Sequence, residues 1–212
     1  ANAEEHIRRK LPSMYHQFKQ LADIDITREP MEVGPTTHYV MGGIRVDAET
    51  QMSTVPGLFA AGECAAGLHG ANRLGGNSLS DLLVFGKRAG EFAAKFAAEH
   101  GSATIDAGEV EEATRWALEP FSRDGASDGP YQISSALQSM MQDLAGIVRR
   151  EEELVRARDG LEQLRKRAAC VGVAGNREYN PGWHTALDLE NLLTVSEAVV
   201  LSAHARKESR GA

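Results

Sequence analysis

Apolar side chains at helical spacing mark the beginning of this chain. Within residues 4–22 they lie three or four positions apart, at Ile7, Leu11, Met14, Phe18 and Leu21. This spacing places them on one face of a helix. Pro12 interrupts the stretch, and proline is well tolerated in the first turn of a helix because its missing N–H would have no partner there. The pattern therefore predicts a helix that starts near Pro12.

Residues 101–212 are almost entirely helical in pattern. Apolar residues recur every seven positions in two series, Ile147, Leu154, Leu161, Ala168 and Ala157, Leu164, Val171. Glu152 and Glu162 each stand four positions before a basic residue, which supports a helix. After a turn at residues 176–182 a last helix follows, with inward positions Leu189, Leu193, Val199 and Ala203. Together with an earlier helix at 110–118, these elements predict a bundle of three or four helices.

Between these helical regions the pattern changes to short apolar runs and glycines. Residues 44–46 and 57–60 predict short buried strands. Residues 67–77 contain four glycines and predict a loop. Helical spacing resumes at Leu79, with Asn77 or Ser78 as the expected N-cap. Small residues form one face of this helix, at Gly86, Ala89, Gly90 and Ala93. We expect that face to pack closely against a sheet.

Composition and charge narrow the possible functions. A formal net charge of -7 without a block of Lys and Arg argues against nucleic-acid binding, which requires a basic face. No apolar run approaches the roughly 20 residues of a membrane span. The two cysteines, Cys64 and Cys170, make neither a disulfide framework nor a zinc site, and they indicate a reducing compartment.

The candidate chemistry lies in the glycine-rich loop and its flanks. The junction of such a loop with a helix offers free N–H groups and the positive end of a dipole to an anion. Arg73 can hold a carboxylate through two parallel hydrogen bonds. Gly75 and Gly76 leave room for a flat ligand close to the backbone. Glu63, after a strand-like run, suits sugar-type hydroxyls, and His38 stands in a second loop.

Each of these residues also has a purely structural interpretation. A single loop histidine such as His38 is more often structural than functional. Arg73 taken alone would more often be a surface arginine, and the glycines alone could form a tight turn. From spacing alone, an anion site and a structural loop remain equally open.

Three longer motifs give the chain a recognisable family pattern. They are Thr-His-Tyr-Val-Met-Gly-Gly at 37–43, Pro-Gly-Leu-Phe-Ala-Ala-Gly-Glu-Cys at 56–64 and His-Gly-Ala-Asn-Arg-Leu-Gly-Gly-Asn-Ser-Leu at 69–79. With them the chain resembles the C-terminal part of the succinate dehydrogenase/fumarate reductase flavoprotein subunit. The last motif is far more specific than a short glycine fingerprint. The likeness weakens between about residues 101 and 180 and recovers at 206–211.

The resemblance implies a role for each matching residue. In that family the residues matching His38 and Arg73 bind the carboxylates of succinate or fumarate. The residue matching Glu63 contacts FAD, and those matching Ser78 and Leu79 lie against the flavin ring. A helix N-terminus at that place would stabilise negative charge on reduced flavin, in agreement with the pattern of the residues.

The resemblance also implies that the chain is part of a longer protein. The family's G-x-G-x-x-G fingerprint, which cradles the pyrophosphate, is absent from this sequence. We expect a mainly α chain with a small α/β part: residues 1–35 as the end of a capping domain, residues 36–100 as the closing segment of a Rossmann-like FAD-binding domain, and residues 101–212 as a helical domain. The isolated chain is expected to be soluble, to lack dehydrogenase activity and to bind FAD weakly or not at all.

The partners implied by the resemblance are those of the parent complex. In the family the flavoprotein docks an iron–sulfur subunit, which passes electrons to membrane anchor subunits and quinone. The expected location is peripheral, on the cytoplasmic side of a bacterial membrane. Two alternatives stay open: a flavoprotein like L-aspartate oxidase, and a non-catalytic helical interaction module whose docking surface is the charged helix at 149–167.

Overall fold

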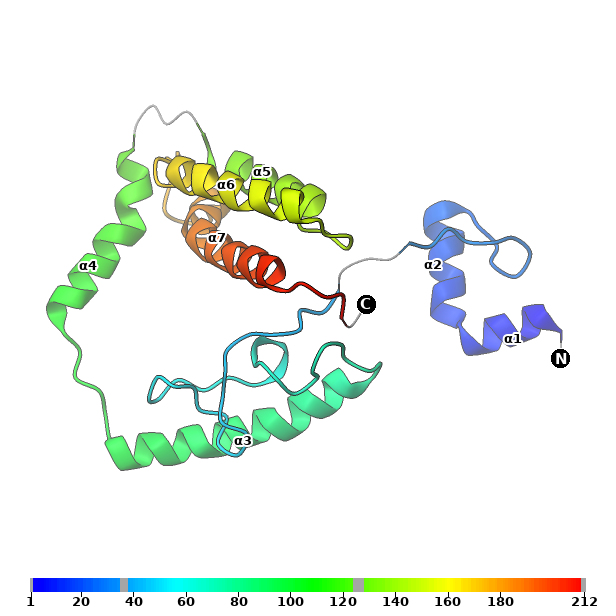
Figure 1. The fold of residues 1–212 in the computed structure, drawn as a ribbon, viewed down its shortest axis with the longest axis horizontal. Coiled ribbons are helices and arrows are strands. Elements are labelled where there is room, and N and C mark those ends of the chain that lie inside the picture. The colour runs from blue at the N-terminus through cyan, green and yellow to red at the C-terminus, as the bar shows by residue number, and fades with distance from the viewer. Residues whose placement is uncertain (1, 35–37, 124–127, 211–212) are drawn as a thin grey trace. The chain divides into compact units, whose positions relative to one another are not determined.

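The computed structural model describes residues 2–34, 38–123 and 128–210. It divides the chain into two compact units, residues 1–36 and residues 37–212. The first unit contains α1 (Ala3–Lys10) and α2 (Pro12–Ala22), drawn in blue in Figure 1. Asn2 caps α1 by accepting a hydrogen bond from the Glu4 amide. Pro12 is the first residue of α2, so the predicted start of this helix is confirmed.

The second unit begins with a segment of turns that leads through a short 3-10 helix, η1 (Gly62–Cys64), to α3 (Asn77–His100). The predicted loop at 67–77 is confirmed, except that Asn77 already belongs to the helix. The predicted N-cap is wrong. Gly76 takes that position with a φ of 84°, and no side chain caps the helix. A glycine adopts this left-handed conformation without a steric penalty, so the chain can enter α3 through the backbone alone.

The two predicted strands are reduced to single bridges. Ile44 pairs with Ala65, Val46 with Ser53, and Met52 with Phe59. No longer ladder forms among the described residues, and Ile44 is 40% exposed rather than buried. Bridges do form within both apolar runs. A strand, however, needs a partner strand along several residues, and even a complete pair of strands is only marginally stable by itself.

The small-residue face of α3 is only partly covered within residues 38–123 and 128–210, since Ala89 and Ala93 are half-buried and Gly86 and Gly90 are exposed. A Cβ built on Gly86 or Gly90 would meet no atom within 4 Å. Leu79, Leu82 and Leu83 are also exposed on this helix. The expected packing of this face against a sheet is therefore wrong for the described part of the chain, because close approach requires a second backbone as well as small side chains.

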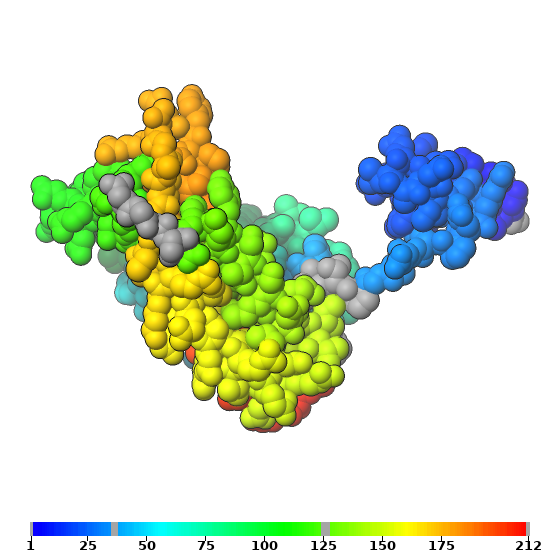
Figure 2. Space-filling view, turned by 90° about the horizontal axis from the view of Figure 1, so that it is seen from above, coloured from blue at the N-terminus to red at the C-terminus, as the bar shows by residue number. Residues whose placement is uncertain are grey.

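The hydrophobic core lies in a bundle of three helices, α5 (Pro130–Leu144), α6 (Glu151–Ala168) and α7 (Pro181–Ala205). The three lie side by side in Figure 1, and Figure 2 shows α5 and α6 packed against each other in yellow-green and yellow. The most deeply buried side chains come from all three helices and the turn after α6: Ile133, Leu137, Leu154, Ala157, Leu161, Leu164, Val171, Leu189, Leu193 and Val200. The predicted bundle is confirmed.

Most of the predicted inward positions are confirmed, and two are corrected. Leu189 and Leu193 are only 2% and 1% exposed. On α7 the fully buried valine is Val200 rather than its neighbour Val199. Val200 follows Leu189 by 11 positions, which is close to three full turns, so the two side chains lie on the same face. Ile147 lies before α6 begins and is 52% exposed, so the first residue of the seven-residue series does not belong to the core.

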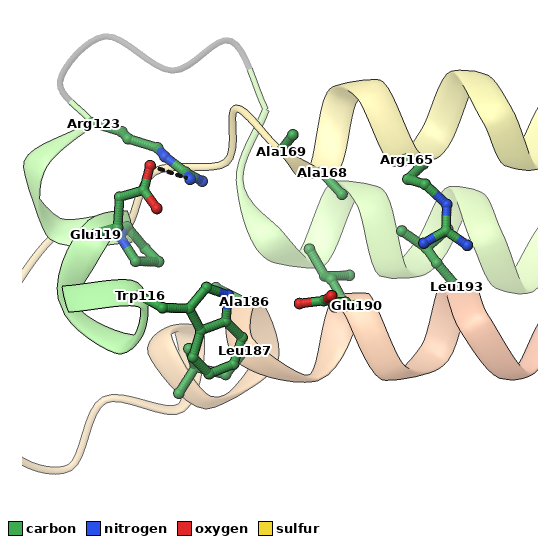
Figure 3. Close-up of a pocket in the computed structure, with 12 residues that line it drawn as sticks. Trp116, Glu119, Arg123, Arg165, Ala168, Ala169, Ala186, Leu187, Glu190 and Leu193 are labelled. Atoms are coloured by element: carbon green, nitrogen blue, oxygen red, sulfur yellow. Dashed lines mark ion pairs between the residues drawn. The ribbon is translucent and has the colours of Figure 1, made fainter. Parts of the chain in front are cut away.

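A fourth helix, α4 (Ala107–Leu118), is capped by Asp106 and contributes no buried residue. It continues into η2 (Glu119–Ser122), which is fastened to the bundle. The Trp183 indole donates to the Ala117 carbonyl at 2.7 Å, and the Val173 amide donates to the Pro120 carbonyl at 2.9 Å. Between these elements lies a hollow of about 340 Å³, with Trp116 and Glu190 among its lining residues (Figure 3). None of the described helices is long and apolar enough to cross a membrane.

Replacing Leu193 tests the position of the core. We expect Leu193→Ala to lower the free energy of unfolding of the chain by about 2–5 kcal/mol, because it leaves a cavity among side chains that cannot fully close it. The control is Leu192→Ala, since Leu192 is 42% exposed and its loss should change stability by less than about 0.5 kcal/mol. Urea unfolding followed by circular dichroism measures both. Equal effects of the two substitutions would contradict the described packing.

An ion pair gives the bundle a defined pH dependence. Arg167, in the last turn of α6, donates two hydrogen bonds of 2.9 Å to the Asp128 carboxylate, and these hydrogen bonds lower the pKa of Asp128. A carboxyl group with a lowered pKa stabilises the fold at pH values above the ordinary pKa of about 4. This contribution is lost as the pH falls through the lowered pKa. The wild type should therefore exceed Asp128→Asn in stability at pH 7, and the difference should disappear as the pH falls through the lowered pKa of Asp128. A difference that is independent of pH would contradict this assignment.

Candidate functional site

Three hydrogen bonds hold the segment at 38–44 against residues 63–66. The Ile44 amide donates to the Cys64 carbonyl at 2.8 Å, and the Ala66 amide donates to the Ile44 carbonyl at 2.9 Å. The Glu63 carboxylate accepts from the Val40 amide at 2.9 Å. Gly43 lies so close to the Cys64 carbonyl that no side chain would fit there. The loop that contains His38 is thereby fixed next to the residue expected to contact FAD.

Arg73 is held in the glycine loop by its own surroundings. Its guanidinium lies over the ring of Tyr39, with 4.6 Å between the guanidinium carbon and the ring centroid. One terminal nitrogen donates to the carbonyl of Leu74 at 3.2 Å. Nε is buried and has no hydrogen-bond acceptor among the described residues. A buried N–H without an acceptor is costly, so this donor is suited to an oxygen atom of a ligand.

Burial raises the pKa of the Tyr39 hydroxyl, and the nearby Asp81 carboxylate raises it further, while Arg73 lowers it. The ring under the guanidinium is therefore neutral at ordinary pH. A neutral aromatic face attracts a cation through its quadrupole, and the attraction grows where water is excluded.

His69 and Asp81 form a second pair behind Tyr39. The Nε2 atom of His69 lies 3.2 Å from a carboxylate oxygen of Asp81, and the side chains are 12% and 4% exposed. The rings of His69 and Tyr39 meet edge to face at 5.7 Å and 82°. Sequence reasoning assigned neither residue a role. The signal available in the sequence was Asp81 itself, an acidic residue among the leucines of the first turns of α3.

The predicted site residues occupy one region of the chain. Arg73 and Ser78 are half-buried, whereas His38, Glu63 and Leu79 are exposed. Within the described residues it is Tyr39, the neighbour of His38 in the sequence, that contacts Arg73. Ser78 and Leu79 stand in the first turn of α3, where the Leu79 amide donates to the Gly76 carbonyl at 3.2 Å.

Glycine backbone surrounds a small hollow next to this site. Its lining includes Tyr39 and His69 together with Gly42, Gly67 and Gly70, and its volume is about 10 Å³. The three glycines have φ values of 135°, 105° and 58°, which other residues rarely adopt. No group of three metal-binding side chains occurs within residues 2–34, 38–123 and 128–210.

Comparison with known proteins identifies the family. The family described as FAD binding domain matches residues 2–79, and the one described as fumarate reductase flavoprotein C-term matches residues 134–212. The chain belongs to the succinate dehydrogenase/fumarate reductase flavoprotein family. The resemblance on which the expected fold was based is thus confirmed.

Individual flavoproteins of this family match along nearly the whole chain. The succinate dehydrogenase flavoprotein subunit of Coxiella burnetii is 36% identical, over 99% of this chain and 38% of that protein. The fumarate reductase flavoprotein subunit of Escherichia coli is also 36% identical, over 99% and 35%. The solved structure of Mycobacterium smegmatis Sdh1 in complex with UQ1 has 55% identity and a TM-score of 0.89, over 98% and 35%. The chain therefore spans little more than a third of the length of these flavoproteins.

The close approach of Gly43 to Cys64 can be tested against a matched glycine. Gly42 and Gly43 have φ values of 135° and 130°, so alanine is strained at both, but only at Gly43 would its Cβ meet the Cys64 carbonyl. Gly43→Ala should therefore break the bonds made by the Ile44 and Ala66 amides and speed their hydrogen exchange by at least about tenfold more than Gly42→Ala does. Similar exchange in the two variants would show that these segments are not joined as described.

Proposed function

We propose that this chain supplies the carboxylate-binding residues and one side of the flavin site of a longer flavoprotein that interconverts succinate and fumarate. The observation that carries the proposal is the state of Arg73. Its buried Nε lacks an acceptor among the described residues, and its guanidinium is held in place on Tyr39. A cation that is partly desolvated and fixed in direction binds a carboxylate more strongly than a mobile surface cation.

The residues present fit FAD as the cofactor of the parent protein. The first turn of α3 places the positive end of a helix dipole next to Gly76, and Leu79 offers an apolar surface that is 68% exposed. A flat apolar ring with an electron-rich edge would be accommodated by this combination. When bound, the flavin accepts or donates a hydride. The Glu63 carboxylate, held by the Val40 amide, is proposed to bind a cofactor hydroxyl.

The chain's own residues would orient the substrate. Arg73 is proposed to bind one carboxylate of succinate or fumarate through paired hydrogen bonds, and His38 to donate a hydrogen bond to the other. With both ends held, the carbons between them have one position relative to the flavin, which lowers the entropic part of the barrier. The positive charge of Arg73 also stabilises the negative charge that develops on the substrate.

We propose that the chain contributes segments to three domains of the parent protein. Residues 1–35 would close the capping domain, residues 36–100 would complete the FAD-binding domain, and residues 101–212 would form the helical domain. The parent would pass electrons to an iron–sulfur subunit, then on to membrane anchor subunits and quinone, from the cytoplasmic side of a bacterial membrane. One related structure is a complex of Mycobacterium smegmatis Sdh1 with UQ1, which supports the proposed quinone.

The two alternatives are less well supported. An enzyme like L-aspartate oxidase would share His38 and Arg73, but the curated relatives described above are named succinate dehydrogenase and fumarate reductase. A helical interaction module would need no buried, unpaired guanidinium nitrogen. Oxidation of aspartate but not of succinate by the full-length protein would reverse the choice of substrate.

Arg73 provides the direct test of this proposal. In the full-length flavoprotein we expect Arg73→Ala to lower kcat/KM for succinate by about 100-fold or more, because a charge-stabilising donor is removed from the substrate. FAD content and assembly with the iron–sulfur subunit should be unchanged. Arg177→Ala is the control, since Arg177 is exposed in the turn before α7. An unchanged kcat/KM of Arg73→Ala for succinate would contradict the proposal.

A further inference from the structure

Asp81 is a buried acid for which the proposed reaction has no use. Its side chain is only 4% exposed, and it lies in the second turn of α3. Burying a carboxylate costs free energy unless a partner compensates. The partner is His69 at 3.2 Å, from the start of the glycine loop. The pair therefore joins this loop to the helix that follows it.

The His69–Asp81 pair continues into the proposed carboxylate-binding residue. The His69 ring meets the Tyr39 ring edge to face at 5.7 Å, and the face of Tyr39 lies under the Arg73 guanidinium at 4.6 Å. Four side chains from α3, the glycine loop and the segment at 38–44 thus form one series, which we call the Asp81–Arg73 series. Asp81 on α3 stands at one end of the series, and the Arg73 guanidinium stands at the other.

We propose that His69 and Asp81 are positioning residues for Arg73. By fixing the Tyr39 ring they set the direction in which the guanidinium presents its N–H groups to a dicarboxylate. The inference rests on the proposed function, because it assigns Arg73 to the substrate. It adds two residues that do not touch the substrate.

The physical need for such residues follows from the loop. An arginine side chain has many rotamers, and this freedom must be lost before it can bind in one geometry. The loop offers few packing contacts to restrain it, since Leu68, Gly70 and Leu74 are exposed. Asp81 lies 12 positions after His69, and the contact between their buried side chains closes this loop. The uncharged Tyr39 ring lies between this pair and Arg73.

The test uses the full-length flavoprotein and malonate, a dicarboxylate that does not react, with binding followed through the flavin absorbance. Asp81→Asn should weaken malonate binding by about tenfold or more while FAD content stays at the wild-type level. His69→Gln is the second variant and should behave in the same way. Asp188→Asn, an exposed acid on α7, is the control and should bind malonate as the wild type does.

A cycle through Tyr39 separates positioning from general support of the fold. In a Tyr39→Phe background, which keeps the ring, Asp81→Asn should still weaken malonate binding by its full factor. In a Tyr39→Leu background it should have no further effect. Equal losses in both backgrounds would overturn the proposal, and so would loss of FAD from both Asp81→Asn and His69→Gln. Wild-type protein that binds no malonate would refute the proposed function itself, whereas normal binding by Asp81→Asn would refute only this inference.

Discussion

The contact between the Arg73 guanidinium and the Tyr39 ring is the interaction on which the candidate site depends. A free guanidinium in water is hydrated and mobile. Here its Nε is shielded from water and the aromatic face compensates part of the lost hydration. The result is a cation with a defined direction in a chain whose formal net charge is -7. Within this chain, a dicarboxylate would be attracted by this local charge and not by the net charge.

The two parts of the second unit are stabilised in different ways. The bundle of α5, α6 and α7 has a continuous apolar core, in which Ile133, Leu193 and Val200 are almost fully buried. The segment around Arg73 has hardly any apolar core among the described residues. Backbone hydrogen bonds, glycine conformations and the His69–Asp81 pair organise it instead. Such polar contacts fix directions more precisely than apolar packing does, but they contribute less to stability.

Much of this organisation could be predicted from the sequence, for reasons that differ between the parts. Leu189 and Leu193 were placed correctly because helix periodicity depends only on neighbours in the same element. The strands around Ile44 and the packing of Gly86 failed because both depend on a second backbone, which a local pattern cannot supply. Gly76 is the N-cap instead of the expected polar residue because its left-handed backbone conformation lets the chain turn into the helix. Asp81 was overlooked because a single acidic residue in a helix has no periodicity, and its partner His69 is 12 positions away.

A structure of the full-length flavoprotein with FAD and malonate would test the account most directly. It predicts that a malonate carboxylate lies within hydrogen-bond distance of Nε or a terminal nitrogen of Arg73, while the guanidinium still rests on Tyr39. A malonate bound elsewhere, with the Arg73 side chain turned away from Tyr39, would contradict it.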